Sequence, residues 1–463
     1  MSQFLFHYVR LEPPTWVFLS TLLVIGLFLM FHRFWSLRNL DILLVLAFTP
    51  GMMLVYEGRQ KAFRIAAQEV VALHGRKDTV IALNAESPDV FVTDGFWAAE
   101  KLLYWGFVWL LICAGLAVTR MLLDTTIVRR PLLDPNLSSG GMLFLGTSLL
   151  IYLMVNVASS SPVEQRRNSP EIGPGYVLLS ALPQISTTPE VASNGVVLPE
   201  STPSSLARVL AIGANLTLVF CILAIGYWHF GNFKTGVGAA TFYLLLPYTA
   251  HMTGRVDHVV PSALLLLSIL MYRQPFVAGL FLGCAAGVVY YPFSLLPLWC
   301  SFYWQRGIRR FAGGFAVSIT ALVVAMIILH PNNLSQDLSY MFGLKQVAMN
   351  GMDGIWGLGW YPVMRIPIIV VFVLLSLSFV VWPAQKNLAT LLSCSSAIMA
   401  ATQFWHGFGG GLYLAWFIPL TLLSIFRPNL DYCSALEVVR PTPRKPSRKS
   451  TLTSEAGSPL PAG

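Results

Sequence analysis

The sequence has few charged residues for its length. Only 11% of its 463 residues are Asp, Glu, Lys or Arg, whereas 55% are hydrophobic, and the mean hydropathy is +0.65. Soluble domains carry about 25% charged residues. This deficit excludes an ordinary water-soluble fold and predicts that much of the chain faces lipid.

Cysteine is also scarce, with six residues in the whole chain. Five of them lie inside apolar runs, and Cys433 lies in the C-terminal tail. No pair has the spacing of metal ligands. We therefore expect neither a disulfide framework nor a metal site, and we interpret these residues as small apolar packing residues.

The motifs of soluble enzymes are missing. The chain has no phosphate-binding glycine loop, no zinc-protease helix motif and no nucleophile elbow, so we expect no cofactor. The glycine-rich run 407–411 lies between two apolar segments, and we predict a tight loop there. Ionisable residues are also rare inside the apolar segments, which disfavours an ion-coupled transporter but leaves neutral substrate paths open.

About thirteen apolar segments run along the chain. They are 15–31, 40–56, 102–123, 141–157, 206–229, 236–250, 259–271, 276–290, 292–304, 311–329, 366–382, 388–402 and 412–426. A helix that crosses a bilayer needs about 20 residues, and several of these segments are shorter. The sequence predicts an all-α, polytopic transmembrane protein with about 11–13 membrane segments, some of them paired half-helices that break at Pro292.

The basic residues predict how the chain is oriented. With the N-terminus outside, the short loops on the inner face hold nearly all short-loop cations, and Arg255 is the exception. The basic tail 427–463 then lies in the cytoplasm, and we expect it to be disordered. Membrane topology therefore explains the net charge of +9, and we expect an inner-membrane protein whose partner is membrane lipid rather than nucleic acid.

The chain divides into four regions. Residues 1–158 are predicted to form N-terminal transmembrane helices with a long outer loop at 57–101. The Ser- and Pro-rich segment 159–205 is predicted to be a flexible outer loop, and 206–426 to form a C-terminal helical core that precedes the tail.

Polar residues gather on the predicted outer face. His251, Arg255, Asp257 and His258 share one short loop, and His406 follows the outer end of a later segment. Such residues can hydrogen-bond to lipid headgroups and water. They can also form a site for a phosphate, because Arg makes multidentate contacts to phosphate oxygens and His can donate a proton.

Two carboxylates on the same face are candidate general bases. Glu57 directly follows a membrane segment, and Asp94 lies near the end of the first predicted outer loop. A carboxylate held at the membrane edge can accept a proton from a hydroxyl. Each residue also fits a solvated loop charge, and Asp94 before Gly95 fits ordinary turn chemistry.

Several motifs together resemble a known enzyme family. They are Gly254-Arg255-Val256-Asp257, the leucine run 264–267, the stretch 273–283 and the Tyr-Pro break within 291–298. Over about 50 residues they resemble the polyprenol-phosphate-sugar-dependent, mannosyltransferase-like branch of the C superfamily of glycosyltransferases. Arg255 and Asp257 stand where that family often has Gln and Asn, and Val289 replaces its Lys.

The resemblance implies inverting sugar transfer from a polyprenyl-phosphate donor. In that scheme Glu57 or Asp94 deprotonates an acceptor hydroxyl, and Arg255 and His258 offset the charge of the leaving phosphate. The donor site would also include Asp257, His251 and His406. The alternative is a membrane transporter, flippase or scaffold protein without chemistry. The enzyme hypothesis predicts that a base lies within about 10 Å of Arg255 and His258.

Overall fold

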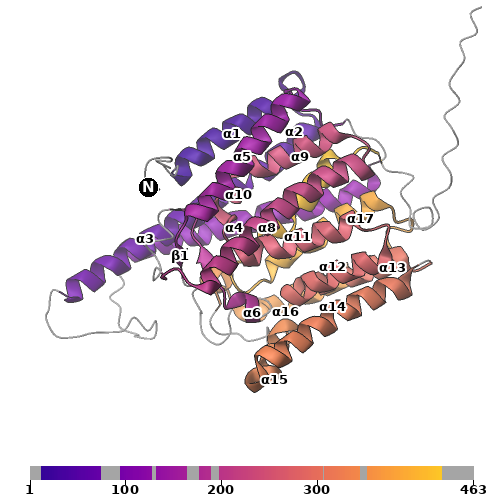
Figure 1. The fold of residues 1–463 in the computed structure, drawn as a ribbon. Coiled ribbons are helices and arrows are strands. Elements are labelled where there is room, and N and C mark those ends of the chain that lie inside the picture. Colours follow the sequence, from indigo (N-terminus) through magenta and orange to yellow (C-terminus); the bar gives the residue numbers. More distant parts are fainter. Residues whose placement is uncertain are drawn as a thin grey trace, which may run out of the picture.

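The computed structural model describes residues 12–74, 94–127, 132–163, 177–188, 198–305, 307–344 and 352–429. Of these described residues, 77% are helical, and almost none are in strands. This confirms the all-α fold. Figure 1 shows the helices running side by side as one bundle.

The helices of the first third are long. They are α1 (Pro13–Phe28), α2 (Leu37–Leu46), α3 (Phe48–His74), α4 (Asp94–Leu123) and α5 (Ser139–Ser159). A short segment follows, with β1 (Pro162–Val163) paired antiparallel to β2 (Gln184–Ile185) and the single turn α6 (Val177–Ser180) between them. The last two thirds contain α8 (Thr202–Ala224), α9 (Phe233–Leu245), α10 (Pro247–Met252), α11 (Val256–Leu270), α12 (Pro275–Val288), α13 (Leu296–Tyr303), α14 (Ile308–Leu329), α15 (Leu334–Met341), α16 (Arg365–Ser378), α17 (Leu388–Ala401) and α18 (Ile418–Phe426).

Five helical stretches within the described residues are long and apolar enough to cross a membrane. They are Leu37–Ile65, Gly95–Thr126, Ser139–Ser159, Thr202–His229 and Ile308–Leu329. Further apolar helices of 10–17 residues, including α11 and α12, lie among them. The structure therefore has the helices of an integral, multi-pass membrane protein, while the total of 11–13 segments and the orientation of the termini stay predictions.

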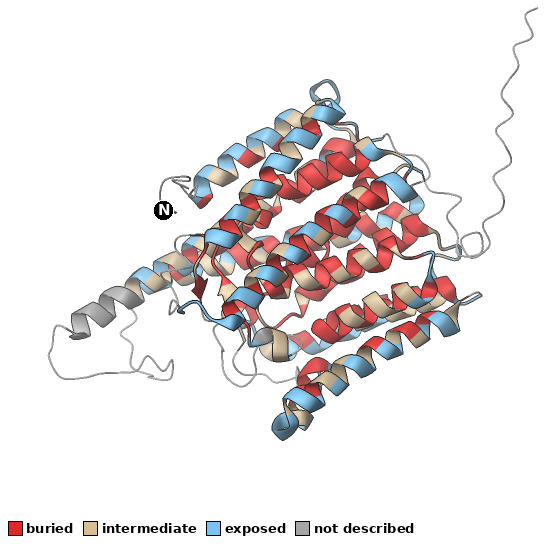
Figure 2. Ribbon diagram, in the orientation of Figure 1, coloured by how far each residue is buried: buried red, intermediate tan, exposed pale blue. Residues whose placement is uncertain are grey.

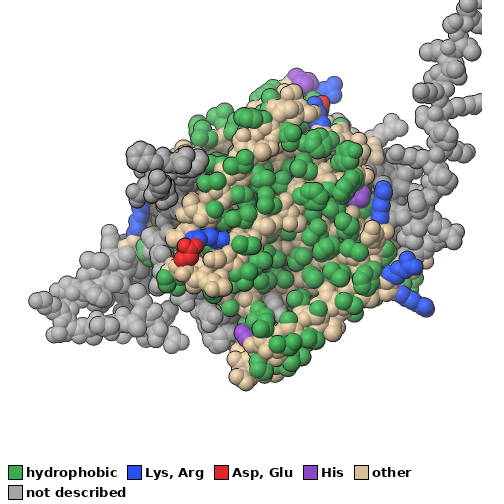
Figure 3. All heavy atoms as spheres, in the orientation of Figure 1, with side chains coloured by type: hydrophobic (Ala, Val, Ile, Leu, Met, Phe, Trp, Pro, Cys, Tyr) green, Lys and Arg blue, Asp and Glu red, His purple; other side chains and the backbone are tan. Residues whose placement is uncertain are grey.

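The surface of the bundle is apolar between its two ends. Phe144 on α5, Ile328 on α14 and Val371 on α16 are 76%, 72% and 66% exposed. Figure 2 shows that buried residues concentrate in central helices such as α9 and α11, whereas exposed residues follow α1, α5 and α14. In Figure 3 hydrophobic side chains cover the middle of this face, and Lys and Arg lie near its margins. Lipid is the solvent that suits such a surface.

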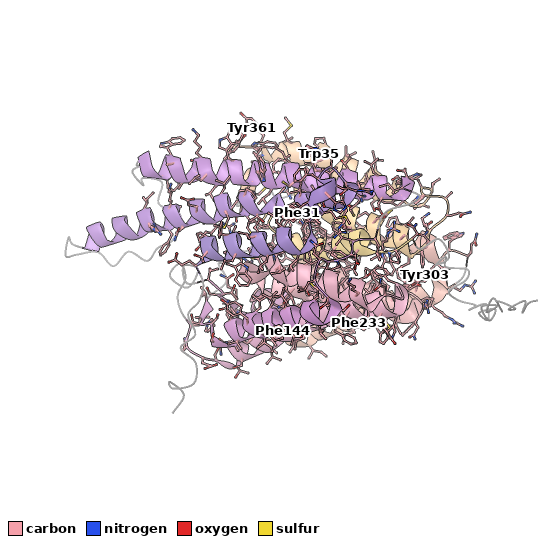
Figure 4. All side chains as sticks on the ribbon, turned by 90° about the horizontal axis from the view of Figure 1, so that it is seen from above. Phe31, Trp35, Phe144, Phe233, Tyr303 and Tyr361 are labelled. Carbon is pink, nitrogen blue, oxygen red and sulfur yellow. The ribbon has the colours of Figure 1, made fainter. Side chains whose placement is uncertain are left out.

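Exposed aromatic side chains surround the bundle. Trp35 and Tyr361 are 81% and 77% exposed. Figure 4 shows them along one margin, with Phe144 and Phe233 along the opposite one. Trp and Tyr are enriched where a membrane meets water, so their exposure agrees with a chain surrounded by lipid and headgroups.

The predicted outer loop 57–101 is wrong at both ends. Helix α3 continues through Glu57 as far as His74, and α4 begins at Asp94. The polar residues after Tyr56 resemble the end of a membrane segment, but a single glycine such as Gly58 costs a helix only about 1 kcal/mol, and residues 57–74 contain no proline.

Close packing of α3 on α4 requires small residues at their interface. A Cβ atom on Gly58 would lie 2.8 Å from Leu103 Cγ, and one on Gly106 would lie 2.7 Å from Val55 Cγ2. Glycines of this kind let two membrane helices approach closely, because van der Waals packing is a main source of helix association in lipid. The α3–α4 pair therefore carries one side of the site described below.

The described part of 159–205 differs from the expected flexible loop. Ile185 of β2 is 1% exposed and packs in a small cluster with Ala211 and Val256. This strand pair covers the start of α11 because its few apolar residues find a complementary surface there. In contrast, the predicted break near Pro292 is confirmed, since α12 ends at Val288 and a 3-10 turn, Tyr291–Leu295, precedes α13.

Candidate functional site

The loop between α10 and α11 is held from outside by hydrogen bonds to its backbone. Asn215 on α8 donates its amide to the carbonyl of Thr253 (3.0 Å), and the Ile185 amide donates to the carbonyl of Gly254 (3.2 Å). A Cβ atom on Gly254 would lie 2.0 Å from the Ile185 carbonyl oxygen. Only glycine allows this approach, so the strand pair fixes the position of the residue that follows.

That residue, Arg255, forms a bidentate ion pair with Asp257. Its Nε and Nη2 atoms donate to the two carboxylate oxygens at 3.1 and 2.7 Å. Asp257 lies in the first turn of α11, where the helix dipole favours negative charge. Pro261 has no N–H to donate to the Asp257 carbonyl one turn earlier, and the Trp416 indole donates to it instead (3.2 Å). Because Pro261 leaves the Asp257 carbonyl free, α11 can hydrogen-bond to the segment before α18.

His258 begins a stack of four aromatic rings. Its Nδ1 atom lies 2.5 Å from the Tyr248 hydroxyl. Its ring stacks on Tyr413 with a centroid distance of 4.3 Å, Tyr413 stacks on His406 at the same distance, and His406 stacks on Tyr291 at 5.0 Å. The stack joins α11, the 3-10 turn before α13 and the loop before α18, which are distant in the sequence.

The glycine run 407–411 forms the tight loop that the sequence predicts. Gly409 and Gly411 adopt φ values of +79° and +99°, which side chains with a Cβ rarely tolerate. The buried Gln403 amide oxygen accepts hydrogen bonds from the backbone N–H groups of Gly411 (3.0 Å) and Tyr413 (3.3 Å). The loop therefore presents Tyr413 and His406 in fixed positions.

A second ion pair lies beside this loop. Arg59 on α3 donates to Asp353 at 2.9 Å. The Asp353 amide donates to the Gly407 carbonyl (2.9 Å), which fixes the aspartate against the loop. Tyr413 follows this loop and stacks on His258, whose Nε2 atom lies 3.8 Å from the Asp257 carboxylate of the first pair. Two Arg–Asp pairs thus flank one tyrosine.

Arg365 is the most unusual residue of the site. It starts α16, is 4% exposed, and donates through Nε and Nη2 to the Trp405 carbonyl at 3.1 and 2.9 Å. Its Nη1 atom lies 3.3 Å from the Met352 sulfur. Within the described residues no carboxylate forms an ion pair with it. A buried guanidinium without a counterion is costly, because burial removes its hydration.

Neighbouring donors are also without partners. His406 Nδ1 accepts the Phe408 N–H (3.0 Å), so we assign the ring proton to Nε2, and this buried atom has no hydrogen-bond partner in the described chain. The indole N–H of Trp405 has none either. Burial, and then the charge of Arg365, holds the pKa of His406 well below its usual value, so the ring is neutral at neutral pH.

The structure brings together only part of the predicted site. Arg255, Asp257, His258 and His406 converge as described, whereas His251 packs its ring against Tyr56 on α3 (5.4 Å). Burial lowers the pKa of His251 to about 4, so it too is neutral.

Of the two predicted bases, Glu57 does not contact the cluster, and the side chain of Asp94 is outside the described residues. Glu57 lies in the body of α3 with its side chain 55% exposed, 3.8 Å from Lys61. Positions two apart on a helix point about 200° apart, so Arg59 rather than Glu57 faces the site. Asp94 begins α4, and its side chain lies outside the described residues. The expected distance of about 10 Å between a base and Arg255 stays a prediction, but the Glu57 side chain points away from the cluster.

Comparisons of this chain with protein-family models, with curated proteins and with solved structures find no match. Within the part of the chain that the structure describes, no group of three or more His, Cys, Asp or Glu side chains is arranged to hold a metal ion. The geometry of the site is therefore the basis for assigning a function.

Sequence reasoning missed four residues that complete this geometry. Arg59, Asp353, Arg365 and Tyr413 come from segments that are far apart in the chain. A signal was present for Arg365 alone, because a single arginine at the start of the apolar segment 366–382 is an ionisable group at a membrane helix, which is functional by default.

Proposed function

We propose that the protein is a membrane glycosyltransferase whose site binds the phosphate of a polyprenyl-phosphate sugar. The observation that carries this proposal is the buried Arg365, which has no carboxylate partner among the described residues and lies beside unpartnered donors. The site as a whole has three arginines, Arg59, Arg255 and Arg365, but only two aspartates, Asp257 and Asp353.

An anionic ligand would supply both things that this part of the site lacks, a counter-charge for Arg365 and acceptors for the free N–H groups. A phosphate would supply the missing counter-charge for Arg365, and its oxygens would accept from the N–H groups of His406 and Trp405. Hydrogen bonds to charged groups contribute about 1.5–3 kcal/mol each, so three such contacts give useful affinity. Neutral ligands would leave the guanidinium uncompensated.

A lipid is the source of phosphate that suits the surroundings. Helix α16, which begins with Arg365, exposes Val371 and Leu374 at 66% and 61%. A polyprenyl chain can lie along such a surface while its phosphate reaches the start of the helix. A soluble phosphate has no apolar part that could contact this face.

Sugar transfer would then proceed as a single displacement. The acceptor hydroxyl oxygen attacks the anomeric carbon, its proton passes to a carboxylate, and the bond from the anomeric carbon to the phosphate oxygen breaks. The polyprenyl phosphate leaves with the electron pair, and Arg365 and His406 offset its growing charge. We assign the base to Asp94 rather than Glu57, because Glu57 faces away from the site.

Binding in lipid nanodiscs tests the phosphate site first. We expect the protein to bind polyprenyl phosphate at least about tenfold more tightly than the uncharged polyprenol, and Arg365→Gln to abolish this preference. Lys234→Gln, whose residue pairs with Asp134 in a half-exposed contact, is the matched control and should bind normally. Equal binding of the charged and uncharged lipids by the wild type would overturn the proposal.

Release of labelled sugar tests the chemistry. Membranes that contain the wild type should transfer sugar from polyprenyl-phosphate [¹⁴C]hexose to an endogenous acceptor, and Asp94→Asn should reduce the rate by a factor of about 100 or more. Binding without any sugar transfer, in wild type and variants alike, would instead favour a flippase or a scaffold protein and refute the enzyme proposal.

A further inference from the structure

The site has two parts that differ in charge and in exposure. The inner part contains Arg365, His406 and the indole of Trp405, all of them less than 10% exposed. The outer part contains the ion pairs Arg59–Asp353 and Arg255–Asp257, whose side chains are 42%, 45%, 29% and 28% exposed. The inner part is positive, whereas the outer part is balanced.

The two outer pairs are organised around one tyrosine. Tyr413 is 6% exposed, and its ring stacks between His258 and His406. His258 lies 3.8 Å from Asp257 of one pair, and a Cβ atom on Gly409 of the same loop would lie 3.7 Å from both Arg59 and Asp353 of the other. Its hydroxyl makes no hydrogen bond within the described chain. A hydroxyl held at this point is free to bind a ligand that reaches between the two pairs.

Stability does not account for the outer pairs. Half-exposed ion pairs contribute only about 0–1 kcal/mol, because water screens them. Arg59 comes from α3, and Asp353 comes from the segment after residue 351. Both side chains lie against the glycine loop 407–411, where they form their ion pair. An arrangement that contributes little stability, yet collects charges from distant segments, is better explained by binding.

We propose that the outer part, Arg59–Asp353 and Arg255–Asp257 around Tyr413, holds the uncharged sugar ring of the donor next to the phosphate in the inner part. Each sugar hydroxyl both donates and accepts, and an Arg–Asp pair offers both functions side by side. A guanidinium has five N–H donors, and a carboxylate has about four acceptor positions, so each pair keeps unused capacity after its own hydrogen bonds form.

Charge balance narrows the class of sugar. The outer part has two positive and two negative groups, so it offers no net attraction for a uronic acid or an amino sugar. Such a sugar would also leave its own charge without a specific partner in a partly buried site. The geometry therefore points to a neutral hexose or pentose. This inference rests on the proposed function, since it presumes that the inner part binds the lipid phosphate.

Three ligands separate the two proposals. Equilibrium binding in nanodiscs is measured for polyprenyl phosphate, for polyprenyl phosphate that carries glucose, and for polyprenyl phosphate that carries glucuronic acid. We expect the wild type to bind the glucose lipid about tenfold more tightly than the bare phosphate and more tightly than the glucuronic acid lipid.

The variants assign this preference to the outer part. Asp353→Asn and Tyr413→Phe should lose the preference for the glucose lipid and keep the affinity for bare polyprenyl phosphate within about twofold. Tyr413→Phe removes only the hydroxyl and retains the ring stack, so we expect this variant to fold normally. A thermal unfolding curve for each variant checks that it is folded. Arg365→Gln should weaken all three ligands in parallel.

The failures of the two proposals are distinguishable. The outer part does not bind the sugar if both outer variants keep the wild-type preference. The same conclusion follows if they weaken the binding of bare polyprenyl phosphate as strongly as that of the glucose lipid. If the wild type does not distinguish polyprenyl phosphate from polyprenol, the phosphate proposal itself fails.

Discussion

Buried arginines behave differently at the two ends of the bundle. At the end opposite the site, Arg120 donates to both oxygens of Asp41 (2.5 and 2.8 Å) and to Asp124 (3.1 Å), and Arg427 donates to Asp124 (2.7 Å). Two arginines meet two aspartates there, and all four side chains are nearly inaccessible. At the site, Arg365 is buried just as deeply and meets carbonyl oxygen and sulfur instead of a carboxylate.

Helix α4 connects these two regions. Its Tyr104 hydroxyl accepts from the Trp360 indole near the site, whereas Arg120 belongs to the ion network. The separation is about 24 Å along the helix axis, at 1.5 Å per residue. The network closes the ends of α2, α4 and α18 and leaves no role for a ligand. The site leaves charge and donors unsatisfied, so burial of an arginine alone does not identify function.

Removing Asp124 should have the largest effect on stability. Asp124→Ala leaves Arg120 and Arg427 buried next to each other with half of their counter-charge lost, and breaking a buried pair costs about 3–5 kcal/mol. Thermal or denaturant unfolding in detergent measures the loss. Lys234→Gln, which breaks a half-exposed pair, should cost less than about 1 kcal/mol. Equal losses in the two variants would contradict a structural role for the network.

A side chain added just before the start of α11 should have the next largest effect on stability. Gly254→Ala forces the strand pair away from the Arg255 loop, since the new Cβ would lie 2.0 Å from a backbone oxygen. We expect a loss of about 1–3 kcal/mol and weaker ligand binding. Gly213 on α8 has open space around it, so Gly213→Ala should instead stabilise by about 0.5–1 kcal/mol. A neutral Gly254→Ala variant would show that the loop is not fixed by β2.

Arg365→Gln should separate stability from binding. The variant removes a buried charge that lacks a carboxylate partner and keeps an N–H donor for the Trp405 carbonyl, so the free energy of unfolding should change by less than about 1 kcal/mol. Polyprenyl phosphate should raise the unfolding temperature of the wild type and not that of the variant. A loss as large as that of Asp124→Ala would mean that Arg365 belongs to a structural network after all.

The smallest effect is expected for Glu57→Gln. Glu57 and Lys61 form an exposed pair one helical turn apart, and such pairs contribute about 0.3–0.5 kcal/mol. Stability and ligand binding should therefore stay close to those of the wild type in the same assays. Loss of sugar transfer with unchanged binding would restore Glu57 as the base.

Much of the fold could be predicted from local patterns. The apolar segments, the break before Pro292 and the tight glycine loop depend on composition and on neighbours in the sequence, and the structure has all three. The start of the first outer loop could not be predicted in this way, because α3 continues as a helix where its residues become polar. Helix propensity and packing on α4 decided its length.

For the site, local sequence shows that the loop of Arg255, Asp257 and His258 is polar and lies at the end of an apolar segment. The other residues that join this loop are set by how distant helices pack. Arg59 faces the site and Glu57 does not because of their angular positions on α3, and Arg365 arrives from a helix more than 100 residues further along the chain. Local patterns fix periodicity and hydrophobicity, whereas the partner of a buried charge depends on how distant helices pack. The same reason explains why Arg120, a cation near the end of the apolar segment 102–123, is an internal partner of Asp41.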